Sequence, residues 1–363
     1  MRALILISTL IFTLYASAPQ EIRAIALSKG LQSIPKEYEA LWLMVDDSDN
    51  PMSLEKIILG KKLFFDKNLS KNRQIACAKC HDINNGGEDG IPTAIGDNSL
   101  PNPSHLNSPT VLNTAFSKHF FWDGRSKTLR DQAKGPMQAL FEMASTPELI
   151  VNRVKENLEY KPLFKNAFTD MEPITFDNIT KAIEVYEKTL VTRSAYDNFL
   201  DGNDSALSPL AQKGLELFID LGCKGCHFGP SIGGQQIQKF PLRDYNSIIN
   251  LTSIYNDKEK KRHVDDFSLN FKQYHPYPFE NVGGFMGKDN DKYFRVPILR
   301  NIRKTAPYFH NGIIKDLREA IFIMGRYQIG VDLNKEQIDA IEMFLKTLEG
   351  NIVDYKFLPI QIK

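Results

Sequence analysis

The arrangement of the four cysteines constrains this chain more than any other feature. They lie in two five-residue runs, CAKCH at 77–81 and CKGCH at 223–227. The pattern C-x-x-C-H is typical of covalent haem attachment, in which both thiols add to the haem vinyl groups and the histidine ligates the iron. Zinc sites and redox disulfides also use paired cysteines, but neither requires a histidine after both pairs. We therefore predict two haem c groups, held by Cys77, Cys80, His81, Cys223, Cys226 and His227.

The N-terminus carries a candidate export signal. Arg2 precedes an apolar run at 3–15, and small residues occupy 16–18. The run has 13 residues, fewer than the ~20 that a membrane-spanning helix needs, so it is typical of a secretory signal peptide. We expect a signal peptide at 1–18. Because Pro19 is unfavourable directly after a cleavage site, cleavage after Ala26 is an alternative, and an uncleaved anchor is a third. Covalent haem attachment also takes place outside the cytoplasm.

Composition narrows the class of protein without identifying it. Hydrophobic residues make up 42% of the 363 residues and charged residues 25%, which disfavours disordered, collagen-like and multi-span membrane chains. Lys and Arg number 45 against 44 Asp and Glu, so the net charge of +1 gives no reason to propose a nucleic-acid partner. The length allows two or three domains.

An internal repeat predicts how the chain is divided. The segments 60–66 and 214–220 both place Leu-Phe-apolar-Asp at the same offset from a glycine, and 182–190 matches 340–348 at six of nine positions. The order of helix, C-x-x-C-H, long connection and terminal helix therefore occurs twice. We predict a mainly α fold of two cytochrome c-like domains, 19–200 and 201–363, each with one covalently bound haem c.

Local signals refine this division. Ser53 and Ser208, the latter followed by Pro209, are predicted to start the helices that precede the two haem motifs. The domain boundary is expected near 194–208, where 201–205 has loop composition. Frequent proline and glycine at 86–109 and 228–287 predict little sheet, and the mixed charge run at 257–266 is expected to be solvated.

Met324 is a candidate second ligand of the second haem. It lies 16 residues before Ala340, the start of the repeated helix, and the same offset in the first half falls on Asn166. Methionine opposite histidine closes the iron and raises its potential, an arrangement for electron transfer. The alternative for Met324 is core packing, the commoner use of methionine at helical spacing.

Several further motifs occur in one order along the chain. They are LGKKLFFD (59–66), CAKCH, NSPTVLNTAF (107–116), FWDGR (121–125), QAKGP (132–136), EM (142–143), CKGCH and TAPYFHNG (305–312) with the following IMG. In these motifs the sequence resembles the bacterial dihaem cytochrome c peroxidases, a family that includes MauG-type relatives. The resemblance extends from about Ser53 to Gly350.

The resemblance implies roles for individual residues. His81 resembles the proximal ligand of the peroxidatic haem, and His227 with Met324 resembles the axial pair of the electron-accepting haem. Trp122 matches the tryptophan between the haems, and Gln132 and Glu142 match the polar pair above the peroxidatic iron. The side chain of Asn107 and the carbonyls of Thr305 and Pro307 match the ligands of an interface calcium ion. Taken alone, Glu142 reads as an exposed helix residue, Trp122 as a core aromatic, and His119 and His310 as structural.

The family resemblance also implies an activity and partners. It implies a periplasmic enzyme, commonly a homodimer, that reduces hydrogen peroxide to water with electrons from a small donor such as a monohaem cytochrome c. A dihaem electron carrier and MauG-like oxidation of a protein substrate are the alternatives. An acid-base group such as Glu142 has no use in a carrier. MauG-type relatives carry tyrosine where this chain has Met324.

One position departs from the family pattern. Many members carry a distal histidine after a Ser/Thr-hydrophobic-Gly step, but here Gly96 is followed by Asp97. The nearby histidine is His105. We expect His105 to act as a displaced distal ligand of the first iron, and a permanently five-coordinate iron is the alternative.

Overall fold

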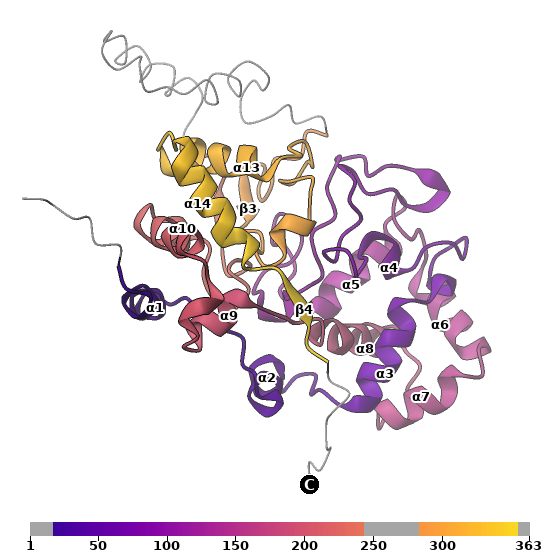
Figure 1. Cartoon of the computed structure of the whole chain (residues 1–363). Coiled ribbons are helices and arrows are strands. Elements are labelled where there is room, and N and C mark those ends of the chain that lie inside the picture. The colour runs from indigo at the N-terminus through magenta and orange to yellow at the C-terminus, as the bar shows by residue number, and fades with distance from the viewer. Residues whose placement is uncertain (1–16, 243–282, 355–363) are drawn as a thin grey trace, which may run out of the picture.

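The two copies of the sequence repeat form two crossed helix pairs. In the first half α3 (Leu54–Phe64) packs across α8 (Phe176–Lys188), and in the second α10 (Pro209–Asp220) packs across α14 (Lys335–Lys346). The computed structural model describes residues 17–242 and 283–354 (Figure 1). The charge run at 257–266 and all but the last two residues of the expected signal peptide lie outside these ranges.

Repeated glycines explain how closely the helices cross. A Cβ atom added to Gly60 would lie 1.9 Å from the carbonyl oxygen of Ala182, and one added to Gly214 would lie 1.9 Å from that of Ala340. Any side chain at either glycine would therefore push the two helices apart. The same contact in both halves shows that the sequence repeat is a structural repeat.

The predicted helix starts are confirmed. The Ser53 hydroxyl accepts a hydrogen bond from the amide of Lys56 at 3.2 Å, and the Ser208 hydroxyl accepts one from the amide of Ala211 at 3.3 Å. Both serines thus satisfy an amide that has no partner within its own helix. Thr175 caps α8 in the same way, so this helix begins several residues before the repeated segment at 182–190.

The remaining elements are short and are joined by long connections. The other α-helices are α1 (Pro19–Ser28), α2 (Tyr38–Val45), α4 (Cys77–Cys80), α5 (Leu129–Gln138), α6 (Pro147–Glu156), α7 (Tyr160–Ala167), α9 (Ala195–Leu200) and α13 (Leu317–Met324). The 3₁₀ turns are η1 (Lys67–Leu69), η2 (Asp97–Ser99), η3 (Thr114–Phe116), η4 (Asp204–Ala206), η5 (Cys223–Gly225) and η7 (Ile302–Lys304), and η8 (Gly325–Ile329) is one π-helical turn.

The described residues contain two short strand pairs, and 86–109 contributes no strand to them. Most of the second segment expected to contain little sheet, 243–282, lies outside the described residues. β1 (Thr192–Ser194) pairs antiparallel with β4 (Gly350–Ile352), and β2 (Ile237–Lys239) pairs antiparallel with β3 (Tyr293–Arg295). In the first pair Thr192 lies opposite Ile352, so the end of the first half is hydrogen-bonded to the end of the second. This pair fixes the two halves against each other.

Two large hydrophobic clusters follow the two halves, with two exceptions. Helix α9 precedes the expected boundary, yet its Tyr196, Phe199 and Leu200 belong to the cluster of the second half. Helix α1 packs on α9 and α10, and its Ile22 and Ala26 are buried in the cluster of the second half. Cleavage after Ala26 would remove most of this helix, whereas cleavage after Ala18 leaves it whole. The cleavage position and the domain limits at 200 and 201 both stay predictions.

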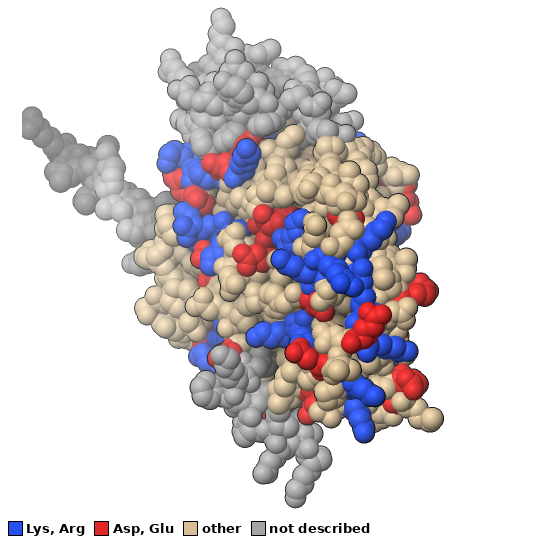
Figure 2. All heavy atoms as spheres, turned by 90° about the vertical axis from the view of Figure 1, so that its right-hand side faces the viewer, with Lys and Arg blue, Asp and Glu red and all other residues tan. Residues whose placement is uncertain are grey.

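The surface carries both charge signs. On the face that bears α6 and α7, Lys and Arg side chains are interspersed with Asp and Glu (Figure 2). One such pair joins Lys62 to Glu159 at 2.5 Å. No helix within the described ranges is both long and apolar enough to cross a membrane.

Candidate functional site

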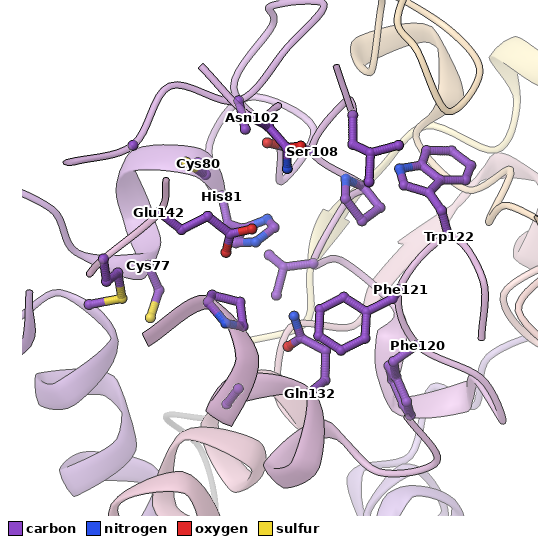
Figure 3. A pocket seen from close by; sticks show the side chains of 18 of the residues that line it. Cys77, Cys80, His81, Asn102, Ser108, Phe120, Phe121, Trp122, Gln132 and Glu142 are labelled. Atoms are coloured by element: carbon purple, nitrogen blue, oxygen red, sulfur yellow. The ribbon is translucent and has the colours of Figure 1, made fainter. Parts of the chain in front are cut away.

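A cavity of about 270 Å³ lies next to the C-x-x-C-H motif of the first half. Its walls come from α4, α5, α8, the connections at 94–111 and 120–125 and the turn at 141–143, and Phe285 and Arg295 of the second half complete them. Cys77 and Cys80 lie at one end and Trp122 at the other, while Gln132 and Glu142 project between them (Figure 3). The structure thus places the proposed haem-binding residues and the proposed acid-base residue around one space.

His81 is oriented for ligation by its other ring nitrogen. Its Nδ1 lies 3.3 Å from the carbonyl oxygen of Gly87, a contact in which the ring N–H donates. That hydrogen bond leaves Nε2 as the lone-pair nitrogen. Burial lowers the pKa of His81, so the ring is held in the neutral form that binds iron.

Glu142 lies in a turn after α5 and not on a helix. Its backbone is fixed because the amide of Asp97 donates to the Glu142 carbonyl at 2.7 Å. Burial raises the pKa of the Glu142 carboxyl to about 7, and the nearby guanidinium of Arg125 opposes this shift. The interpretation of Glu142 as an ordinary exposed helix residue is therefore wrong. A carboxyl with this pKa can both accept and return a proton near neutral pH.

Gln132 is positioned by the start of α5. Thr128 caps this helix by accepting from the amide of Asp131 at 3.2 Å, and Gln132 follows on the side that faces the cavity. The amide side chain of Gln132 offers both a donor and an acceptor to anything bound between it and Glu142.

Trp122 lies where the two halves meet. Its ring N–H donates to the carbonyl oxygen of Asn107 at 2.8 Å, and its own carbonyl accepts from the amide of Arg295 at 2.7 Å. The ring is also in edge contact with that of His310, with centroids 6.3 Å apart. Trp122 is buried, and it joins one residue of the first half to two of the second. His310 stacks on Phe294, in agreement with a structural role.

The cavity contains a buried cation that the sequence analysis did not single out. Arg295 is 3% exposed, its Nε has no hydrogen-bond partner, and its guanidinium lies 5.9 Å from the Trp122 ring. Burial alone lowers its pKa to about 10, because no carboxylate in the described part of the chain is close enough to oppose that shift. A buried, unpaired guanidinium requires an anionic partner.

The two ends of the cavity therefore match the two edges of a haem, one of which carries vinyl groups and the other carboxylates. Thiols stand at the Cys77 and Cys80 end, where the vinyl edge would attach. The unpaired Arg295 stands near Trp122, where the carboxylate edge would lie. The residues present thus fit a haem c, although nothing in the sequence around Arg295 identifies it.

Glu187 also lines this cavity and was not singled out. The signal that could have found it is the sequence repeat. At this position the first half has glutamate and the second half has Leu345. A charged residue at a core position of a repeated helix is a recognisable exception.

The second C-x-x-C-H motif surrounds a buried histidine. Its first residues form η5, and His227 is 7% exposed with a buried Nδ1 that has no hydrogen-bond partner. Burial lowers the pKa of His227 to about 4, so the ring is neutral at physiological pH. A buried, neutral imidazole beside two free thiols fits a second haem.

Met324 ends α13, immediately before the π-helical turn η8. It is half-buried, whereas the four residues before it, Ala320–Ile323, are all buried. Core packing alone would bury Met324 as it buries its neighbours. A π-helical turn is common at functional sites, since it re-aims side chains.

The two alternatives for the cysteines lack support in this structure. Burial raises the pKa of Cys80 and Cys223 to about 12, whereas redox-active thiols need a lowered pKa. No group of three or more His, Cys, Asp or Glu side chains within 17–242 and 283–354 could hold a metal ion, so zinc is not supported. All four cysteines lie in these ranges and are free.

Two of the three expected calcium ligands are adjacent. The side-chain amide nitrogen of Asn107 donates to the carbonyl oxygens of Pro307 at 2.6 Å and of Phe309 at 3.4 Å. The Oδ1 of Asn107 is buried without a partner. Thr305 directly follows the neighbouring turn η7. A rotation of the amide by half a turn would direct Oδ1 and the Pro307 carbonyl to one point, a donor set suited to calcium.

His105 does not line the cavity, although both of its neighbours, Ser104 and Leu106, do. Its φ of 48° lies in the left-handed region, which is unfavourable for histidine. Asp97 is buried beside Asn72 and Asn98, which both donate to its Oδ2. The connection therefore places neither side chain in the wall of the cavity that His81 lines.

Comparisons with known proteins identify a family. The sequence profile of the family described as di-haem cytochrome c peroxidase matches residues 54–205. The chain is 40% identical to cytochrome c551 peroxidase of Pseudomonas aeruginosa over 314 residues, which cover 85% of this chain and 83% of that protein. It is 41% identical to the methylamine utilization protein MauG of Methylorubrum extorquens over 274 residues, 75% of this chain and 69% of that protein.

The fold is also similar to a solved structure. A MauG-like protein associated with microbial copper homeostasis superposes with a TM-score of 0.68 at 26% identity, over 86% of this chain and 95% of that one.

Proposed function

The chain belongs to the di-haem cytochrome c peroxidase family, and from this premise we propose that it reduces hydrogen peroxide to two waters in the periplasm. Two electrons come one at a time from a small redox protein, such as a monohaem cytochrome c. The observation that carries this proposal is the position of Glu142 in the cavity that Cys77 and His81 also line. Its pKa of about 7 is suited to moving a proton.

The haems would be held by this chain's own residues, one in each cytochrome c-like domain. Cys77, Cys80 and His81 hold the first, and the second is held by Cys223, Cys226, His227 and Met324. When bound, haem supplies the redox iron and, in the first half, the place where peroxide binds. Arg295 neutralises the carboxylate edge of the first haem.

Glu142 moves the proton that peroxide cleavage needs. Its carboxylate accepts the proton of the inner peroxide oxygen, and the resulting carboxylic acid gives that proton to the outer oxygen, which leaves as water. Gln132 orients the peroxide through its amide. Phe121 and Met137, which also line the cavity, keep its walls apolar.

Electrons enter through the second half and reach the first near Trp122. The indole contacts the backbone of Asn107 on one side and of Arg295 on the other, so it bridges the halves. Calcium at Asn107, Thr305 and Pro307 would order the same junction. Asn107 is two residues from His105. An ion bound at Asn107 would therefore also affect the position of the segment that carries His105, the candidate distal ligand.

The sequence favours peroxide reduction over the two alternatives. A pure electron carrier would not need a half-buried carboxyl and an amide facing the open side of a haem. MauG-like oxidation of a protein substrate has a relative in its favour, but Met324 stands where MauG-type relatives place tyrosine. Homodimerisation stays a prediction from the family.

The test is steady-state turnover of haem-loaded protein with peroxide and a reduced monohaem cytochrome c. We expect two haems per chain by pyridine haemochrome assay, and oxidation of two donor molecules for each peroxide. A fully loaded protein that does not turn over would be a carrier.

An electron paramagnetic resonance spectrum of the oxidised protein tests His105: a low-spin bis-histidine first iron supports ligation, and a high-spin one supports an open site.

A further inference from the structure

Glu187 is a buried carboxyl group that the proposed reaction does not use. It lies on α8, is 5% exposed, and lines the same cavity as Cys77. Its Oε2 is buried without a hydrogen-bond partner. Burying a carboxyl group without a partner is unfavourable, so such a group is rarely found in a wall that only packs. Its position therefore points to a role toward whatever fills the cavity.

Glu187 acts at the cysteine end of the cavity. Burial, and then the charge of Glu187, raise the pKa of the Cys77 thiol. Neither Arg295 near Trp122 nor the carboxyl of Glu142 interacts electrostatically with Glu187. Glu187 is thus neither the counter-ion of the buried guanidinium nor a partner of the acid-base carboxyl. It is a separate proton-binding group beside the edge where the haem would be attached.

Among the described residues, Glu184 is the one charged group that affects the pKa of Glu187. Glu184, one turn away on α8, accepts from the Asn50 amide at 2.8 Å and lies 3.8 Å from Lys188, which also pairs with Asp47. Burial first, and Glu184 second, raise the pKa of Glu187 to about 8.

The neighbouring helices add no further charge interaction. Those packed against α8 carry Glu55, Lys56, Lys61 and Lys62 on α3, Arg130, Asp131 and Lys134 on α5, and Glu148, Arg153, Lys155 and Glu156 on α6, and none of them shifts the pKa of Glu187. On α4 the Cys77 thiol is the titratable neighbour, and it ceases to titrate once it becomes a thioether.

We propose that Glu187 couples proton uptake to reduction of the haem in the first half. This rests on the proposed function only in placing a haem at Cys77, Cys80 and His81. One electron from the donor protein removes one positive charge from the haem, and the Glu187 carboxylate then takes one proton from solvent. When the electron leaves, the carboxylic acid releases that proton. The net charge of the buried site is the same before and after, which a low dielectric favours.

The sequence repeat supplies an internal control. The residue of the second half that corresponds to Glu187 is Leu345, which cannot bind a proton. The haem at His227 should therefore lack this coupling, within the same molecule and under the same conditions.

The experiment is a spectroscopic redox titration of each haem in the loaded protein, on both sides of pH 8. In the wild type we expect the potential of the first haem to fall as pH rises. Glu187→Gln should hold that potential at its low-pH value throughout, because a neutral amide imitates the protonated acid. Glu148→Gln, at an exposed site on α6, should behave as the wild type. A pH dependence in Glu187→Gln equal to that of the wild type would overturn the proposal.

A second measurement needs no variant, in case Glu187→Gln does not assemble. Infrared difference spectra of wild-type protein labelled with carbon-13 in its glutamate carboxyls separate these groups from the haem carboxylates. Reduction of the first haem above pH 8 should produce one protonated glutamate signal, and its absence would contradict the proposal. Neither measurement requires turnover, so a protein without peroxidase activity could still pass both.

Discussion

The two halves share a crossed helix pair and differ in the long connection between its two helices. Gly60 against Ala182 and Gly214 against Ala340 make the same helix crossing. In each half the first helix of the crossing precedes the C-x-x-C-H motif along the chain, and the second helix follows it. In the first half the long connection builds α5 and the turn that carries Glu142, which open a cavity. In the second it builds α13, which ends at Met324. The repeat thus specifies where a haem can be attached, and the connections decide what each haem can do.

The largest effect is expected from Glu142→Gln. Loss of a proton-transfer group costs roughly 10²- to 10⁴-fold in rate, and both haem spectra should stay unchanged. Because the base must be deprotonated, wild-type turnover should rise as pH rises through the pKa of about 7, and the variant should lose this rise. Steady-state rates across pH measure both effects.

The control is Glu148→Gln, since Glu148 is exposed and does not line the cavity. Unchanged turnover in Glu142→Gln would mean that another group moves the proton. The Glu142 carboxyl would then not be what makes the first half differ in function from the second.

Arg295→Met should affect the first haem alone. Removing one partner of a buried ion pair costs about 3–5 kcal/mol, because the haem carboxylates would lose their counter-ion. Loss of the positive charge should also lower the potential of this haem. Chemical unfolding of loaded protein and redox titration provide the measurements, and Arg295→Lys should retain most of both properties. An equal shift at both haems would show that Arg295 serves the junction and not one cavity.

Gly60→Ala and Gly214→Ala should damage the two halves alike. Each added methyl would meet a carbonyl oxygen, and overpacking of this kind typically costs ~1–3 kcal/mol. Denaturant unfolding of the two variants measures the cost. Gly225→Ala is the control, because nothing lies within 4 Å of its added Cβ and the first half carries Lys79 at the matching position. Strongly unequal costs would mean that the two crossings are not equivalent.

Calcium removal should have the smallest effect. Chelation should lower the free energy of unfolding by ~1.4 kcal/mol for free calcium about ten times its dissociation constant. Asn107→Ala should be insensitive to chelation, since it lacks the side-chain oxygen. Differential scanning calorimetry with and without chelator tests this. If chelation does not change the stability of the wild type, the proposal of a calcium ion at the junction of the halves is wrong.

Much of the frame and part of the site were readable in the sequence. Periodicity and capping residues predicted the helices after Ser53 and Ser208, because a helix start depends on residues three positions apart. Motif order predicted the residues at 77–81 and Glu142, which the structure brings around one cavity. The packing of α1 on the second half was not predicted, since a short amphipathic helix does not specify which apolar surface it will cover.

What the sequence determined by itself is local: two haem-attachment motifs, the helices around them and a repeat that pairs them. The burial of Arg295 and Glu187, the pKa of Glu142 and the position of His105 outside the cavity were decided by the tertiary structure alone. The reason is physical. Whether a charged side chain has a partner or is shielded from water depends on segments far away in the sequence, such as β3, which is hydrogen-bonded to Trp122. A local sequence pattern contains no information about such contacts.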